Sequence, residues 1–161
     1  RACALAREHG IRFTHETHRG RPTYSAIETR RYLEAVPEMR LNADFSHWMV
    51  VHESDLADQE ENVRLAVGRC DHIHARVGFE EGPQVSDPRA PEWKGAVDRH
   101  VHLWRGIVDA HRKAGSPFLT VVPEFGAPPY VPVLPYTRQP VVDVWEVNVY
   151  MKDLLKRELA A

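Results

Sequence analysis

The chain has 161 residues, of which 43% are hydrophobic and 27% charged, and its formal net charge is −2. This size suits one domain of an ordinary globular protein. The near-neutral charge argues against bulk electrostatic attraction to nucleic acid or to an anionic membrane, and no apolar run approaches the ~20 residues of a membrane span. The two cysteines lack metal-binding or redox spacing and fit reduced thiols, which predicts a cytoplasmic protein.

Apolar residues recur along the chain with the periods of helices and strands in alternation. In order, we expect a helix end over 1–9, a strand over 11–16, a helix over about 25–36, a strand over 39–47, a helix over about 57–68, a strand over 70–78, a helix over about 95–114, a strand over 118–126 and a helix over about 141–158. A chain that starts within a helix looks like a cut through a larger protein.

This alternation predicts a parallel sheet with right-handed crossovers, because each strand is followed by a helix. Four strands are expected, whereas a closed (β/α)8 barrel has eight. Four parallel strands alone leave two unpaired edges. The predicted fold class is therefore α/β of the (β/α)8 TIM-barrel type, with about four βα units in a half barrel. We expect a single domain over 1–161 that is the C-terminal portion of a barrel, or a chain that completes its barrel by association, as in a homo-oligomer.

A polar side chain lies near the end of each predicted strand. These residues are Glu16, Asp44, His74 and Glu124, and they are separated by 28, 30 and 50 residues. Side chains at the carboxyl ends of parallel barrel strands converge on one mouth, so the four groups are expected to bind one divalent metal ion. Oxygen ligands with one nitrogen favour Mn²⁺, Mg²⁺ or Co²⁺, and Zn²⁺ also accepts this set.

The strand over 70–78 carries further polar residues with a period of two. This alternation places Cys70, His72, His74 and Arg76 on one face. His72 then has two readings that the sequence leaves open. It is either a residue that supports the metal site or contacts substrate, or a hydrogen-bonded histidine of the barrel interior.

Four short motifs resemble the last four strand ends of the xylose isomerase-like TIM-barrel superfamily. They read THETHR, ADFSHW, HIHARVG and VPEFG, and they occur in the family's order and spacing. The superfamily includes sugar isomerases and epimerases, inosose dehydratases and endonuclease IV. The resemblance implies that the metal ligands are those of the sugar epimerases, namely Glu16, Asp44, His74 and Glu124.

The resemblance also implies residues that contact a substrate. His47 matches a histidine three positions after the aspartate, and Arg76 matches only approximately, because the epimerases place their arginine further along. Either side chain could polarise a carbonyl or hold a hydroxyl group. Trp48 or Phe125 could cover the apolar face of a sugar.

Chemistry at such a site follows from its charges. Moving a proton α to a carbonyl requires stabilisation of an enediolate, which a divalent cation supplies, and a base and an acid on opposite faces. Glu16 and Glu124, on separate strands, are the expected catalytic pair. The substrate is then a small polyhydroxylated molecule, a sugar or a sugar phosphate.

The first expected function is a metal-dependent isomerase or epimerase. A lyase of the inosose or dehydroshikimate dehydratase type uses the same proton abstraction, and the sequence does not separate the two. A nuclease of the endonuclease IV type needs three metal ions, more histidine ligands and a basic surface, which a net charge of −2 does not favour. An inactive barrel fragment is the remaining alternative.

Overall fold

Four parallel strands form one sheet, in chain order, in a computed structural model that describes residues 1–160. The strands are β1 (His15–Glu16), β2 (Leu41–Ala43), β3 (Cys70–Ala75) and β4 (Thr120–Pro123). Helical segments connect each strand to the next, as parallel pairing requires. The predicted α/β half barrel with parallel strands is confirmed.

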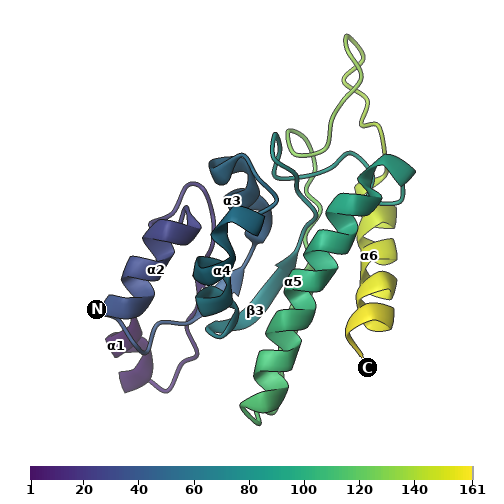
Figure 1. Cartoon of the computed structure of the whole chain (residues 1–161). Helices are drawn as coiled ribbons and strands as arrows, with labels where there is room; N and C mark the ends of the chain where they lie inside the picture. Colours follow the sequence, from purple (N-terminus) through teal and green to yellow (C-terminus); the bar gives the residue numbers. More distant parts are fainter. Residues whose placement is uncertain (161) are drawn as a thin grey trace.

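Helices cover one face of this sheet. Figure 1 shows α2, α4, α5 and α6 side by side, with α1 below α2 at the lower left. The helical segments are α1 (Ala2–Glu8), α2 (Ala26–Ala35), α3 (Phe45–His52), η1 (Ala57–Gln59), α4 (Glu60–Val67), η2 (Pro91–Trp93), α5 (Lys94–Lys113) and α6 (Val144–Leu159). Within residues 1–160, no helix combines the length and apolar character that a membrane crossing requires.

The two faces of the sheet differ in exposure. Ile73 and Ala75 of β3 are fully buried against the helices, whereas Val122 of β4 is 45% exposed on the opposite face. Successive strand residues point to opposite sides, so His74 shares the open face. That open face is the side that would line the interior of a barrel.

A bulge interrupts the alternation of β3. Leu41 pairs with Cys70, but the next residue of β2, Asn42, pairs with His72, so Asp71 is an extra residue in β3. Cys70 therefore points to the helical side, where its thiol donates to the carbonyl of Ala66. The prediction that Cys70 shares a face with His72 and His74 is wrong for this reason.

The second strand ends earlier than expected. Residues 39–47 were expected to be strand, but β2 stops at Ala43 and Asp44 is the N-cap of α3. Phe45 to His52 form a helix where a loop was expected. The first five residues of α3, 45–49, are buried, and Glu53 ends the helix in a left-handed conformation (φ 48°).

The first predicted strand is also shorter, because only His15 and Glu16 pair with β2. Phe13 is 41% exposed and Ile11 is 64% exposed at this edge of the sheet. The strand has a partner on one side only, so the segment before His15 has no second ladder to hold it extended.

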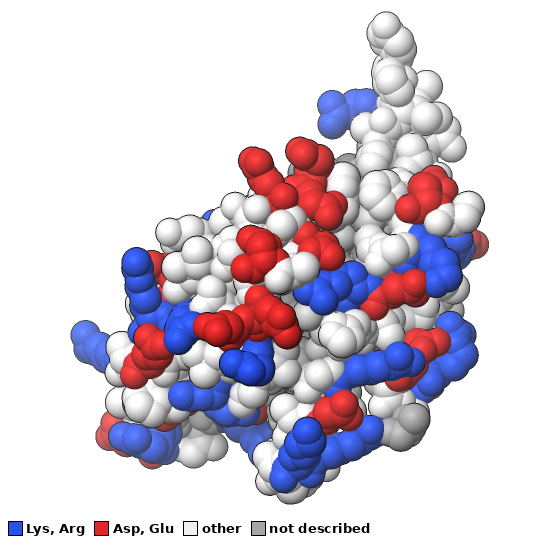
Figure 2. Space-filling view, in the orientation of Figure 1, with Lys and Arg blue, Asp and Glu red and all other residues white. Residues whose placement is uncertain are grey.

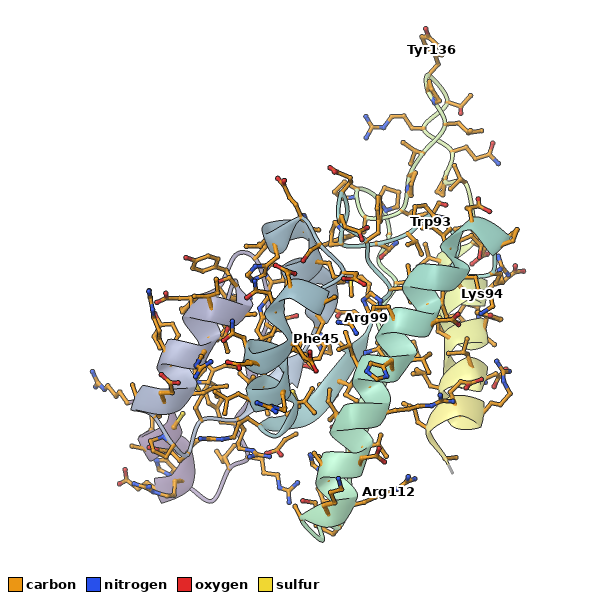
Figure 3. All side chains as sticks on the ribbon, in the orientation of Figure 1. Phe45, Trp93, Lys94, Arg99, Arg112 and Tyr136 are labelled. Atoms are coloured by element: carbon orange, nitrogen blue, oxygen red, sulfur yellow. The ribbon has the colours of Figure 1, made fainter. Side chains whose placement is uncertain are left out.

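The last helix begins at Val144 rather than near residue 141, because the Asp143 side chain accepts hydrogen bonds from the backbone N–H groups of Trp145 and Glu146. Before it, residues 131–141 form an arm with an antiparallel bridge between Val133 and Pro140. The arm extends beyond the body at the end where the strands terminate, with the exposed Tyr136 at its tip (Figures 1 and 3).

Candidate metal centre

The four predicted metal ligands come together at the carboxyl end of the sheet. Each offers one ligand atom, and these atoms all lie within 4.8 Å of one another. Glu16 ends β1, Asp44 follows β2, His74 lies in β3 and Glu124 follows β4. Equivalent positions on four adjacent parallel strands therefore bring together residues that are far apart in the sequence.

His74 is the centre of the cluster. Its Nδ1 lies 3.2 Å from Oε1 of Glu16 and 2.7 Å from Oε2 of Glu124. Burial disfavours the charged imidazole, but the contact with Glu124 and the nearby carboxylates outweigh it and raise the pKa of His74. The other ring nitrogen, Nε2, lies 2.9 Å from Nδ2 of Asn42.

Asp44 is the buried member of the set, with no exposed side-chain surface. Ser46 donates to its Oδ1, and Nη2 of Arg76 donates to its Oδ2. The backbone N–H of Asp44 donates to Oγ1 of Thr17 at 2.7 Å. Burial raises the pKa of Asp44 to about 6, although Arg76 and Ser46 act in the opposite direction. The carboxylate thus has a fixed orientation.

His47 lies beneath the cluster and not on its surface. Nη2 of Arg76 donates to its Nε2 at 2.8 Å, and the ring of His18 lies over it with the centroids 3.9 Å apart. Burial, and then the positive charge of Arg76, lower the pKa of His47 to about 3. His47 has no exposed side-chain surface in this conformation, because the first turn of α3 directs it back toward Asp44 and the ring of His18 lies over it, and its substrate contact stays a prediction.

Arg76 lies between the buried Asp44 and the partly exposed Glu124. Its guanidinium is 3% exposed, contacts Asp44, and lies 3.8 Å from Oε2 of Glu124. It also lies over the ring of Tyr130, 4.6 Å from the centroid. In this conformation Arg76 is the counter-ion of the buried carboxylate. Tyr130 had no signal in the sequence, because it belongs to the proline-rich segment after β4.

The other residues that were expected to contact substrate lie in different parts of the structure. His72 lies on the open face, with its Nδ1 2.5 Å from Oγ1 of Thr120, and its ring is 5.0 Å from that of His74. Trp48 and Phe125, which were expected to cover a sugar, both lie in the core of this structure, and the contacts stay predictions. Trp48 is fully buried in the core and donates to the carbonyl of Thr23, and Phe125 is 5% exposed. Both rings complete the apolar core and do not face the cluster.

The donor set fits one divalent ion. Oxygen and nitrogen ligands about 2.0–2.2 Å from an ion lie up to about 4.4 Å apart, close to the spread of the four ligand atoms. Oε2 of Glu124 is buried and has no hydrogen-bond partner among residues 1–160, although Nδ1 of His74 lies close to it. Two ligand atoms this close together are placed so that both can bind one cation.

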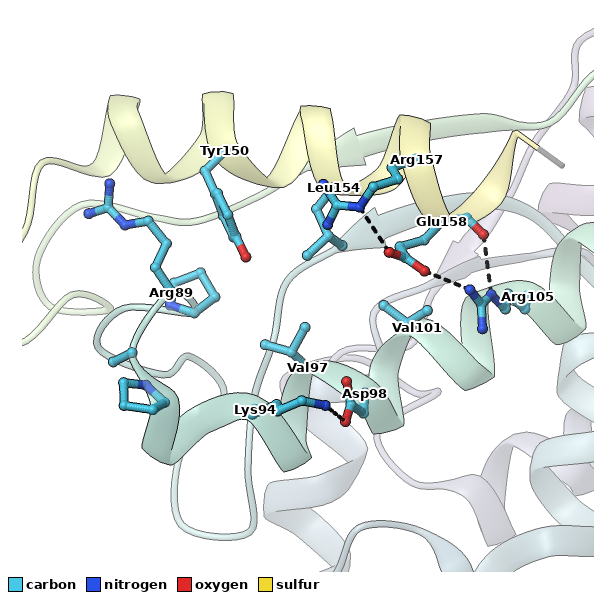
Figure 4. Close-up of a pocket in the computed structure, with 13 residues that line it drawn as sticks. Arg89, Lys94, Val97, Asp98, Val101, Arg105, Tyr150, Leu154, Arg157 and Glu158 are labelled. Atoms are coloured by element: carbon cyan, nitrogen blue, oxygen red, sulfur yellow. Dashed lines mark hydrogen bonds and ion pairs between the residues drawn. The ribbon is translucent and has the colours of Figure 1, made fainter.

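A second concave region lies on the other side of the molecule, between α5 and α6 (Figure 4). Its volume is about 420 Å³. Its charged side chains pair with each other: Arg105 lies 2.6 Å from Glu158, and Lys94 contacts Asp98. This groove is separated from the metal cluster by the sheet and offers no group to it.

Comparison with protein families agrees with this geometry. The family model described as xylose isomerase-like TIM barrel matches residues 1–113. The match includes Glu16, Asp44 and His74, whereas Glu124 lies beyond it. No curated protein and no solved structure matches the chain. Because the matched segment spans α1 to the end of α5, the chain belongs to the xylose isomerase-like TIM-barrel family.

Proposed function

We propose that this chain carries the metal centre of a sugar or sugar phosphate isomerase or epimerase. The observation that supports the proposal is the convergence of Glu16, Asp44, His74 and Glu124 at the end of the sheet, beside an open face. A divalent ion held there, Mn²⁺, Mg²⁺ or Co²⁺, would stabilise the negative charge of an enediolate.

Glu16 and Glu124 are the proposed base and acid. They belong to the two outer strands of the sheet, so they approach His74 from opposite sides. Burial alone would raise the pKa of Glu124, but its contact with His74 and the charge of Arg76 lower it. Glu124 is therefore ionised at neutral pH and can accept a proton. Each glutamate approaches His74 through one oxygen, which leaves the second oxygen for proton transfer.

His72 is the proposed substrate contact nearest to the open face. It is partly exposed, whereas Arg76 and His47 are buried behind the cluster. Burial lowers the pKa of His72, so its ring is neutral at pH 7 and can exchange hydrogen bonds with a hydroxyl group. Arg76 and His47 act on the reaction by holding Asp44 in place.

The surface charge favours this proposal over a nuclease. Figure 2 shows cationic and acidic side chains mixed over the helical face, with no continuous basic area on the face in view. Exposed acids follow α3 and continue into η1, among them Glu53, Asp55 and Asp58. A DNA-binding surface requires cations that contact successive phosphates.

Solvent exchange tests the proposed function. The Mn²⁺-loaded protein is incubated with ketoses and ketose phosphates in D₂O, and NMR follows deuterium at the carbon next to the carbonyl and the appearance of the epimer or isomer. We expect exchange in the wild type and a 10²–10⁴-fold loss in Glu16→Gln and Glu124→Gln. Glu158→Gln in the groove is the matched control and should retain full activity.

The same spectra distinguish the alternatives. Exchange that is accompanied by loss of a β-hydroxyl group identifies a lyase. Unchanged turnover in Glu124→Gln contradicts the role of that residue, and a complete absence of exchange with every substrate, despite bound Mn²⁺, contradicts the proposed reaction.

A further inference from the structure

The ring of His74 is held from both edges by polar groups. Nδ1 faces the two glutamates, and Nε2 lies 2.9 Å from Nδ2 of Asn42. Asn42 is 7% exposed. Its Oδ1 is buried and, within the described part of the chain, has no hydrogen-bond partner. A buried amide oxygen without a partner is unfavourable unless another arrangement of the site uses it.

A metal ion at the cluster would determine whether Nε2 of His74 donates or accepts a hydrogen bond. Nδ1 is the nitrogen that faces the glutamates, and it can bind a cation only through its lone pair. The single proton of the neutral ring must then be on Nε2, which becomes a hydrogen-bond donor. The Nδ2 group of Asn42 is also a donor, so it cannot be the partner of Nε2–H.

A rotation of the carboxamide resolves this conflict. Turning the Asn42 side chain by about 180° around its terminal torsion exchanges the places of Oδ1 and Nδ2. The unpartnered Oδ1 then accepts from Nε2–H of His74. We propose that Asn42 is a positioning residue that selects the Nε2–H tautomer of His74 and thereby presents Nδ1 to the divalent ion. This inference rests on the proposed metal centre.

Hydrogen bonds hold the backbone of Asn42, so its side chain stays beside the ring of His74. Its carbonyl accepts from the backbone N–H of Thr17 at 3.0 Å and from Oγ1 of the same residue at 3.4 Å. Asn42 lies two positions before Asp44, on the central strand β2 between β1 and β3. Rotation of the amide can therefore occur without movement of the strand.

Replacing the residue that hydrogen-bonds a metal-ligating histidine commonly weakens metal affinity by about 10–100-fold. We expect Asn42→Leu, which has no acceptor, to weaken Mn²⁺ binding by such a factor in titration calorimetry. Asn42→Asp supplies an acceptor that cannot donate, and should bind Mn²⁺ at least as tightly as the wild type. Asn62→Leu, on α4 and away from the cluster, is the control and should bind normally. Urea unfolding without metal should show all three variants folded.

Nitrogen-15 NMR reads the tautomer directly in protein loaded with diamagnetic Zn²⁺. The wild type and Asn42→Asp should show the proton of His74 on Nε2. Wild-type affinity in Asn42→Leu, a loss in Asn42→Asp as large as that in Asn42→Leu, or a proton on Nδ1 in the loaded wild type would each overturn the inference and leave the metal centre intact. A wild type that binds no divalent ion would refute the metal centre itself.

Discussion

The strand-end cluster and the groove between α5 and α6 both contain several charged side chains, but their charges are arranged differently. In the groove the cations have carboxylate partners close by, such as Arg105 with Glu158, Lys94 with Asp98 and Arg89 with Asp87. In the cluster three carboxylates converge on His74, and Arg76 is already bound to one of them. The charges of the groove are already paired with one another, whereas the excess of carboxylates in the cluster would be offset by an added cation.

The largest expected difference between the two regions is in the stability that is lost when Arg76 or Arg105 is replaced. Arg76→Met leaves Asp44 buried without its counter-ion and should lower the free energy of unfolding by about 3–5 kcal/mol. Arg105→Met breaks a pair at the surface and should cost less than about 1 kcal/mol. Urea unfolding of both variants in EDTA measures the difference. Equal losses would mean that the buried pair contributes no more than the exposed one.

The pH dependence of the free energy of unfolding should show how α5 supports the loop that follows Arg76. Nε2 of His100 accepts from the backbone N–H of Gly78, in the loop after Arg76, and burial lowers the pKa of His100 to about 4. Below its ordinary pKa of 6.5 the ring is protonated in the unfolded chain but stays neutral in the fold. Stability is complete above that pH and falls toward pH 4, by about 3 kcal/mol in total.

In His100→Gln the free energy of unfolding should therefore fall less steeply between pH 6.5 and 4, because unfolding takes up about one proton fewer. Urea unfolding at a series of pH values measures the slope. His102 lies on the same helix but is exposed, and His102→Gln should leave the profile unchanged. A profile that is equally steep in both variants would show that His100 is not the group that titrates.

Added metal should stabilise the protein only through the cluster. Mn²⁺ at 100 times its dissociation constant should raise the free energy of unfolding by about 2.7 kcal/mol, reversibly with EDTA. Thermal unfolding should show this gain in the wild type and in Glu158→Gln, but not in Glu124→Gln. The same gain in Glu124→Gln would place the ion elsewhere.

The smallest effect is expected in the groove. Lys94 and Asp98 are an i,i+4 pair with side chains 75% and 61% exposed. Lys94→Ala should change the free energy of unfolding by less than about 0.5 kcal/mol and leave Mn²⁺ affinity unchanged. A reduced metal affinity in this variant would contradict the separation of the two regions.

The sequence predicted the order of strands and the convergence of the four strand-end residues, because periodicity and spacing determine both in a parallel fold. It did not predict α3, because Asp44 ends a strand and begins a helix within one motif. The burial of Trp48 and the shielding of His47 by His18 depend on packing between distant segments, and no local pattern records that packing. Asn42 could have been found, since it lies two positions before Asp44 on one strand.

The extra residue in β3 also determines which donor atoms lie beside the candidate metal centre. Had Asp71 taken a regular place in the ladder, with no bulge, the sulfur of Cys70 would face the same side as His72 and His74. Instead it is enclosed by the helices, and its burial raises the pKa of the thiol, so it stays protonated. The candidate ligand set on this face therefore holds carboxylate oxygens and the imidazole of His74 but no thiolate, a set that suits Mn²⁺, Mg²⁺ or Co²⁺ better than a soft cation such as Cd²⁺.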